Sequence, residues 1–209
     1  VNTEDGAVPL CDLIARDPEG QLGPDRARQF DGRLPFLLKV LAAEQPLSLQ
    51  AHPSRAQARE GFARENAAGI PLDAPHRNYR DDNHKPEMVV ALSRFEALAG
   101  FRPPAETVEF LRDLGVSEVT PYASELGDNL DATGLRALFT AWMTLPTKSL
   151  VGLTDAVLTG CGRYLEARSG SEDEFTAAAR TALELGLAYP EDPGVLASLL
   201  LNRVSIDRK

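Results

Sequence analysis

The hydrophobic pattern of this sequence changes at Pro103 and Pro104, and no other feature constrains the fold as strongly. Before these prolines the apolar runs are short and are interrupted by proline, glycine, asparagine and aspartate, which is typical of strands and loops. After them apolar residues recur at the 3.6-residue spacing of helices. The sequence therefore predicts an α+β fold, with a mixed first half and an all-helical second half.

In the first half we expect strands at the short apolar runs 36–41, 47–51 and 88–92. Residues 95–101 either continue the last of these strands or pair with it. The apolar spacing within residues 10–14 predicts a helix.

A second helix is expected directly after Pro53, because Ser54 and Gln57 have the spacing of a capping box. Residues 69–85 are rich in proline, asparagine, aspartate and arginine, and this composition predicts an irregular loop. Loops of this length are solvated connectors or functional elements.

In the second half the first helix is predicted to end at Gly115 and the next one at Pro146. The predicted helices cover residues 107–114, 131–145, 150–168, 172–185 and 194–202. Two sets of apolar residues at helical spacing are predicted to be core contacts: Leu135, Leu138, Phe139 and Trp142, and Val157, Leu158, Cys161 and Leu165.

The charge balance disfavours nucleic acids and anionic membranes as partners, because 31 acidic residues against 22 basic ones give a net charge of -9. No apolar run approaches the ~20 residues of a membrane span. The first residues lack the pattern of a signal peptide. Cys11 and Cys161 fit no metal or redox spacing and are expected to be reduced thiols. These features predict a cytoplasmic protein.

Polar residues that can bind a metal flank two of the predicted strands. Gln50 and His52 are two residues apart, so on a strand they face the same side, and Glu87 directly precedes the strand 88–92. If these strands share a sheet, an amide, an imidazole and a carboxylate converge, and zinc accepts such nitrogen and oxygen ligands. The alternative is that all three are ordinary polar residues of loops or of the surface.

Other polar residues also have two interpretations. His84 is a solvated loop residue, or it handles protons or binds a hydroxyl beside the metal. Lys39 either extends from a sheet edge or points into a polar pocket. Ser48 shares the face of Gln50, and its hydroxyl could help a lysine to hold a phosphate. The loop residues His76, Arg77 and Arg80 are expected to be solvated.

Four blocks of sequence resemble the type I mannose-6-phosphate isomerases. In order they are Leu-Pro-Phe-Leu-Leu-Lys-Val-Leu at 34–41, Leu-Gln-Ala-His-Pro at 49–53, Tyr-Arg-Asp-Asp-Asn-His-Lys-Pro-Glu-Met at 79–88, and Phe-Glu-Ala-Leu-Ala-Gly-Phe-Arg-Pro at 95–103. The resemblance implies a cupin-type β-barrel or jelly roll with a following inserted helical domain. It implies an enzyme that interconverts mannose 6-phosphate and fructose 6-phosphate through a cis-enediol, with one zinc ion.

The resemblance also assigns roles to residues of this sequence. Gln50, His52 and Glu87 correspond to zinc ligands, and Lys85 and His84 border the sugar as candidates for proton handling or hydroxyl contacts. Lys39 and Ser48 correspond to part of the phosphate and substrate pocket. The implied partner is therefore a small sugar phosphate. The sequence does not indicate an oligomeric state.

The sequence departs from the family in extent. Members have further barrel strands at both ends, and a histidine from the strands after the helices is the fourth zinc ligand, whereas no histidine follows His84 here. We therefore expect a partial cupin-like domain at 1–103, a helical domain at 104–202 and a truncated return toward the barrel at 203–209. The resulting hypothesis is an isomerase segment that is poorly active by itself.

Two rival hypotheses remain open. In the first, the chain is a non-catalytic module that binds a sugar phosphate or a protein and retains half of a metal site. In the second, it is a metal-dependent cupin-like enzyme for a different phosphosugar. Binding without isomerisation would favour the first, and a preference for another aldose phosphate would favour the second.

Overall fold

The computed structural model describes residues 1–3 and 6–208, and the chain divides into two compact units, Val1–Gln45 and the chain from Pro46 onward. Both helices and antiparallel strands occur, so the mixed fold class is confirmed in this coarse form. The predicted boundaries at residues 103 and 202 stay predictions. Glu4 and Asp5 of the predicted domain 1–103, and Lys209 of the predicted segment 203–209, lie outside the residues that the structure describes.

The first unit consists of a minimal strand pair and three short helices. The antiparallel strands β1 (Asn2–Thr3) and β2 (Gly6–Ala7) precede α1 (Leu10–Arg16), which confirms the helix predicted at residues 10–14. The helices α2 (Pro18–Leu22) and α3 (Pro24–Gln29) were not predicted. Both begin with proline at the first helical position, where its missing N–H has no consequence.

The predicted strands at 36–41, 47–51 and 88–92 are wrong for this structure, in which these segments are extended but unpaired. Within the described residues, none of the three makes a backbone hydrogen bond to another segment. Most of their apolar side chains therefore stay exposed, for example 86% of Leu38 and 87% of Met88, whereas Ala91 is buried. A strand requires a partner that accepts and donates along its length, and an apolar run alone does not supply one.

The helix predicted after Pro53 is confirmed as α4 (Arg55–Ala67). Its capping box is complete, since the backbone N–H of Gln57 donates to the Ser54 hydroxyl and the N–H of Ser54 donates to the Gln57 side chain. The segment that follows, residues 69–85, contains no helix or strand, as predicted.

Six helices form the core of the second unit, in the part of the chain that was predicted to be helical. Their side chains enclose Phe110, Trp142, Val157, Cys161 and Leu196, which are at most 1% exposed. The helices are α5 (Pro104–Asp113), α6 (Thr120–Asp128), α7 (Ala132–Met143), α8 (Thr147–Ala167), α9 (Glu174–Ala188) and α10 (Gly194–Ser198).

Most of the predicted helices are confirmed, with shifted ends. α5 begins three residues earlier than expected, because Pro104 is well suited to a first helical position, and Gly115 follows its end with a φ of 62°. α6 was not predicted. The predicted helix 194–202 is wrong beyond Ser198, because Leu201–Ile206 form the strand β4.

Among the helices of residues 1–3 and 6–208, none combines the length and the apolar character that a membrane-spanning helix requires.

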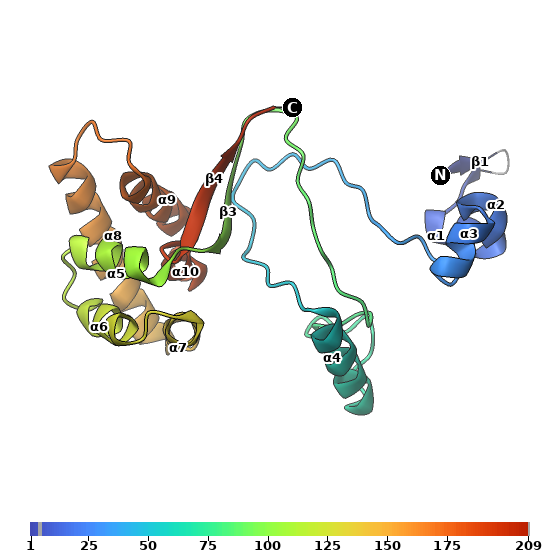
Figure 1. The fold of residues 1–209 in the computed structure, drawn as a ribbon, viewed down its shortest axis with the longest axis horizontal. Coiled ribbons are helices and arrows are strands. Elements are labelled where there is room, and N and C mark those ends of the chain that lie inside the picture. The colour runs from blue at the N-terminus through green and yellow to red at the C-terminus, as the bar shows by residue number, and fades with distance from the viewer. Residues whose placement is uncertain (4–5, 209) are drawn as a thin grey trace. The chain divides into compact units, whose positions relative to one another are not determined.

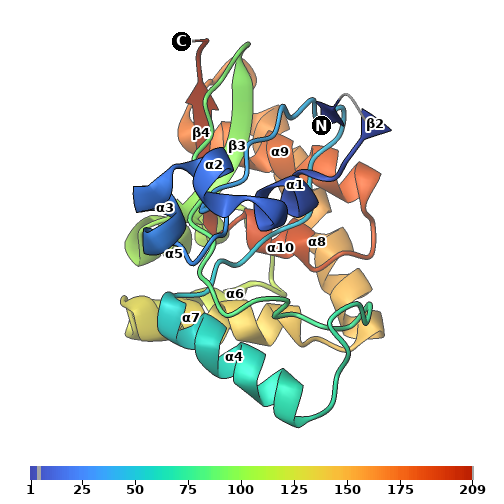
Figure 2. The same cartoon turned by 90° about the vertical axis from the view of Figure 1, so that its right-hand side faces the viewer.

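The strand β3 (Phe95–Phe101) confirms the strand predicted there, but its partner is β4 rather than residues 88–92. Figures 1 and 2 both show β3 and β4 side by side, with β3 leading into α5 and β4 following α10. The antiparallel register joins Phe95 to Ile206 and Leu98 to Arg203, with an irregularity before Phe101.

Arg102 connects the strand pair to the helices through hydrogen bonds and an ion pair. The side chain is completely buried, and its guanidinium donates to the carbonyls of Leu199 (2.9 Å) and Leu201 (3.4 Å) and contacts Glu174. Because a buried guanidinium needs acceptors for its N–H groups, this arrangement fixes how the chain enters and leaves the helical part.

Candidate functional site

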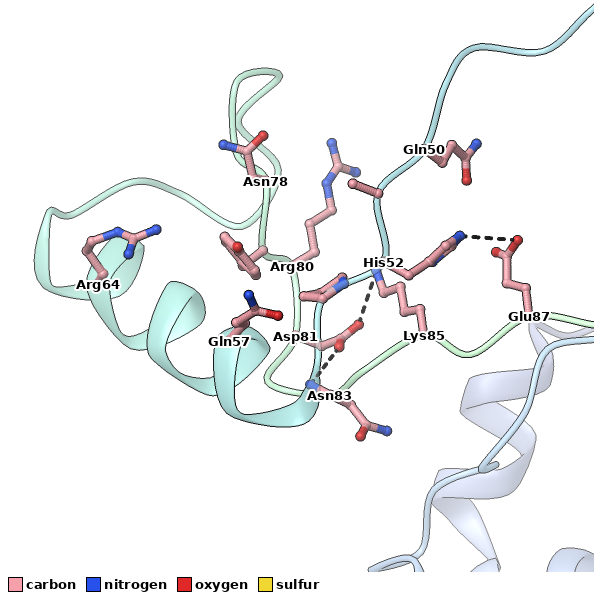
Figure 3. A pocket seen from close by; sticks show the side chains of 13 residues that line it. Gln50, His52, Gln57, Arg64, Asn78, Arg80, Asp81, Asn83, Lys85 and Glu87 are labelled. Atoms are coloured by element: carbon pink, nitrogen blue, oxygen red, sulfur yellow. Dashed lines mark hydrogen bonds and ion pairs between the residues drawn. The ribbon is translucent and has the colours of Figure 1, made fainter. Parts of the chain in front are cut away.

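The side chains of His52 and Glu87 meet, although they come from segments far apart in the sequence. The distance from His52 Nε2 to Glu87 Oε2 is 3.6 Å. Both residues line an open pocket of about 680 Å³ in the second unit, together with Gln50 and Lys85 (Figure 3). The structure therefore brings four of the predicted site residues to one pocket.

The helix α4 fixes the position of the His52 side of this pocket. His52 lies two residues before Ser54, whose reciprocal hydrogen bonds with Gln57 set the direction in which the chain enters the helix. Figure 3 shows the amide of Gln50 and the ring of His52 on the same side of this segment. That arrangement agrees with the two-residue spacing of an extended chain, although the segment is not a strand.

The loop before Glu87 is held by its own polar side chains. Asp81 accepts the backbone N–H of Asn83 at 3.0 Å and lies 3.7 Å from the ammonium group of Lys85. His84 does not line the pocket, and its ring nitrogen Nε2 lies 3.1 Å from the guanidinium of Arg55. Arginine has only donors, so in this contact the His84 nitrogen is the acceptor.

Two of the predicted substrate residues lie outside the pocket. Lys39 belongs to the first unit and its side chain is exposed, and Ser48 is exposed and does not line the pocket. The structure therefore does not bring the Ser48 side chain to the pocket of the His52–Glu87 pair. Their assignment to a phosphate pocket stays a prediction.

Sequence reasoning missed several residues of the pocket, and it was wrong about a residue behind it. The missed lining residues are Gln57, Arg64, Asn78, Tyr79, Arg80, Asp81 and Asn83. Arg77 was expected to be solvated but is only 5% exposed, because its guanidinium is enclosed by acceptors from α4 and the loop. Gln57 and Arg64 lie on α4, and the other missed residues lie in the segment 69–85, whose composition did not distinguish them.

The separation of His52 and Glu87 is compatible with two ligands of one zinc ion. Two ligands that each lie ~2.0–2.1 Å from zinc at a tetrahedral angle are about 3.3 Å apart, close to the observed 3.6 Å between His52 and Glu87. Within residues 1–3 and 6–208, no cluster of three or more histidine, cysteine, aspartate or glutamate side chains could hold a metal. Gln50 lines the same pocket as this pair, and its role as a third ligand stays a prediction.

Comparison with known proteins identifies the family. Residues 2–104 match the sequence model of the phosphomannose isomerase type I catalytic domain. A mannose-6-phosphate isomerase of Escherichia coli strain K12 is 38% identical over 210 residues, which cover 99% of this chain. The chain belongs to the type I phosphomannose isomerase family.

Relatives and solved structures of phosphomannose isomerases resemble the chain over nearly its full length. The human mannose-6-phosphate isomerase is 33% identical over 94% of this chain. The structure of the Salmonella typhimurium enzyme bound to fructose 6-phosphate and zinc has a TM-score of 0.80 and is 35% identical. A zinc-bound structure has a TM-score of 0.81, covering 99% of this chain and 50% of that one.

The match covers only part of the length of each relative. The chain covers 49% of the Escherichia coli protein and 45% of the human protein. It thus spans about half the length of the curated relatives that it matches.

Proposed function

We propose that this chain contributes the metal-binding part of a zinc-dependent mannose-6-phosphate isomerase, which interconverts mannose 6-phosphate and fructose 6-phosphate. The observation that carries the proposal is the contact of His52 with Glu87 beside Gln50 and Lys85 in one pocket. The family membership supports it, since the Salmonella typhimurium relative is described with both this class of sugar phosphate and zinc.

The fold assignment is part of this proposal. Residues 1–103 would be part of a cupin-type β-barrel, residues 104–202 the inserted helical domain, and residues 203–209 the return toward the barrel. The pairing of β3 with β4 supports an insertion, because the helices leave and rejoin the sheet at neighbouring points. We also propose a cytoplasmic location, which is consistent with the free thiols of Cys11 and Cys161.

Gln50, His52 and Glu87 would hold one zinc ion. When bound, zinc would polarise an oxygen of the sugar phosphate and stabilise the charge that develops there. Glu87 is the only anionic member of the set, so the site retains a net positive charge. Because the neutral Gln50 amide binds without cancelling that charge, its oxygen is a suitable third donor.

The isomerisation moves a proton from C2 of the open-chain aldose to C1 through a cis-enediol, and a base must accept and return that proton. Lys85 is a candidate for this proton transfer, because it lines the pocket with His52 and Glu87 and its amine could accept the proton. His84 is a candidate for a hydroxyl contact, with its orientation set by Arg55. Lys39 and Ser48 would bind the phosphate group.

A coupled isomerisation assay on the purified chain tests the proposal. The protein is stripped with a chelator, assayed with mannose 6-phosphate, and assayed again after zinc is added back. We expect weak turnover that depends on zinc and is lost in His52→Ala, while His76→Ala, which removes an exposed histidine outside the pocket, behaves as the unmodified chain. Robust turnover would contradict the expectation that this segment is poorly active by itself.

Substrate binding separates the proposal from the alternative functions. If calorimetry detects mannose 6-phosphate binding but no product forms with or without zinc, the chain is a sugar-phosphate-binding module. Preferential turnover of a different aldose phosphate would assign the site to another phosphosugar enzyme.

A further inference from the structure

A buried cluster of charged and polar groups lies behind the pocket, where the loop after α4 returns along that helix. At its centre are Arg77 and Glu65, whose side chains are 1% and 9% exposed and approach to 3.7 Å. The Arg77 guanidinium donates to the carbonyl of Tyr79 and the Asn66 side chain, both at 2.6 Å, and to the carbonyl of Ile70. One arginine thus joins the end of α4 to both ends of the loop segment 70–79.

The Glu65 carboxylate holds the same segment from the helix side. One oxygen accepts the backbone N–H of Tyr79 at 2.8 Å, and the other accepts the backbone and side-chain N–H groups of Asn78. These hydrogen bonds, that of Tyr79 most strongly, and the nearby Arg77 lower the pKa of the Glu65 carboxyl. Both oxygens are therefore occupied by groups of the loop.

Close packing completes the cluster. The Arg77 guanidinium lies over the ring of Phe62, 5.1 Å from its centre. The ring of Tyr79 lies directly on Gly61, where a Cβ would overlap the ring carbons. The loop thus rests on a face of α4 that admits it only because residue 61 has no side chain.

The position of α4 in the chain links this cluster to the metal set. The helix begins just after His52, at the cap residue Ser54, and the cluster lies in its last turns. The loop leaves the cluster at Tyr79 and continues through Lys85 to Glu87. A second contact, from Arg55 in the first turn to His84, holds the loop near its other end.

We propose that Glu65 and Arg77 are positioning residues, which fix the loop 78–87 against α4 and so hold Glu87 and Lys85 beside His52. In this arrangement α4 sets the distance between Gln50 and His52, which precede it, and Glu87, which follows the loop. Neither residue touches the pocket, and each acts through the backbone of Asn78 and Tyr79. The inference deepens the proposed function and rests on it for the identity of the metal.

The test combines zinc affinity with hydrogen exchange on the full chain. Arg77→Gln removes the charge and most of the donors. Arg180→Gln is the matched control, because Arg180, on α9, is half exposed and pairs with Glu172 before that helix. Competition with a fluorescent zinc indicator gives the affinity, and mass spectrometry gives the exchange of residues 78–87 and 104–198.

We expect Arg77→Gln to weaken zinc binding by about tenfold or more, the size of effect seen when groups that orient metal ligands are removed. Amide exchange should accelerate in residues 78–87 and stay unchanged in the helices, and Arg180→Gln should match the unmodified chain. Acceleration over the whole chain would mean that Arg77 is merely structural, and unchanged affinity and exchange would also refute the positioning role.

Two further variants keep the test decisive if Arg77→Gln does not fold. Glu65→Gln preserves the size of the side chain but replaces one acceptor oxygen with an NH₂ group, and Gly61→Ala displaces the Tyr79 ring without changing any charge. Both should weaken zinc binding in the same way. If the unmodified chain binds no zinc, the proposed function fails, and the amide exchange of residues 78–87 in the variants then decides the positioning role. Faster exchange confined to these residues upholds that role, and unchanged exchange refutes it.

Discussion

Two glycines two residues apart in α8 should respond differently to replacement by alanine. Gly160 is buried, and an added Cβ would overlap the Cγ2 methyl of Val116 and lie 3.3 Å from the Leu114 carbonyl oxygen. Gly162, on the same helix, has nothing within 4 Å of that position. The pair therefore separates the effect of close packing from the effect of helix propensity.

The expected magnitude follows from these two surroundings. Replacing glycine with alanine inside a helix stabilises it by about 1 kcal/mol, and this gain applies to both variants. Gly160→Ala must in addition displace Val116, a β-branched residue that is 4% exposed, and overpacking of this kind costs about 1–3 kcal/mol. The free energy of unfolding should thus be lower for Gly160→Ala than for Gly162→Ala by about 1–3 kcal/mol.

Urea denaturation followed by circular dichroism measures this difference directly. Gly162→Ala should unfold at a higher urea concentration than the unmodified chain, and Gly160→Ala at a lower concentration than Gly162→Ala. Equal midpoints for the two variants would refute a close contact between Gly160 of α8 and the 114–116 turn.

Three simpler measurements test other parts of the structure. Cys11 is exposed, whereas burial raises the pKa of the Cys161 thiol to about 12, so one thiol per folded chain should react with a disulfide reagent and two after denaturation. Hydrogen bonds from Thr176 and Ser171 lower the pKa of Asp173 from 3.8 to about 2; its contribution to stability is therefore complete above pH 4 and is lost as the pH falls toward 2, and Asp173→Asn should reduce the fall of the urea midpoint over that range. Trp142, which is 1% exposed, should emit at short wavelength, resist acrylamide quenching and shift to longer wavelength on unfolding.

The sequence predicted those parts of the fold that depend on neighbouring residues. The capping box of Ser54 and Gln57 and the glycine after α5 are formed by residues close in the chain, so their spacing was sufficient. The strands at 36–41, 47–51 and 88–92 were predicted from apolar runs alone. Strand formation depends on a distant partner, and these segments have none within the described residues.

The candidate site was only partly predictable for the same reason. The approach of His52 to Glu87 was expected, but from a shared sheet, whereas the structure brings them together through α4 and its loop. Arg77 was expected to be solvated, as a charged residue in a polar loop usually is. Its acceptors are Asn66 on the helix and carbonyls brought near by the fold of the loop, and no local pattern marks them.

The pairing of β3 with β4 has a consequence for the order of folding. The two strands are separated by the whole helical segment, so in an unfolded chain their pairing would close a loop of about 100 residues, at a substantial cost in chain entropy. Once α5 to α10 have packed, the carbonyl of Leu199, which follows α10, lies at Arg102, which precedes α5, and most of that entropy has been lost with the helices. The two strands are then held close together, as the strands of a hairpin with a short loop are. We therefore expect β3 and β4 to pair after the helices have packed and never before.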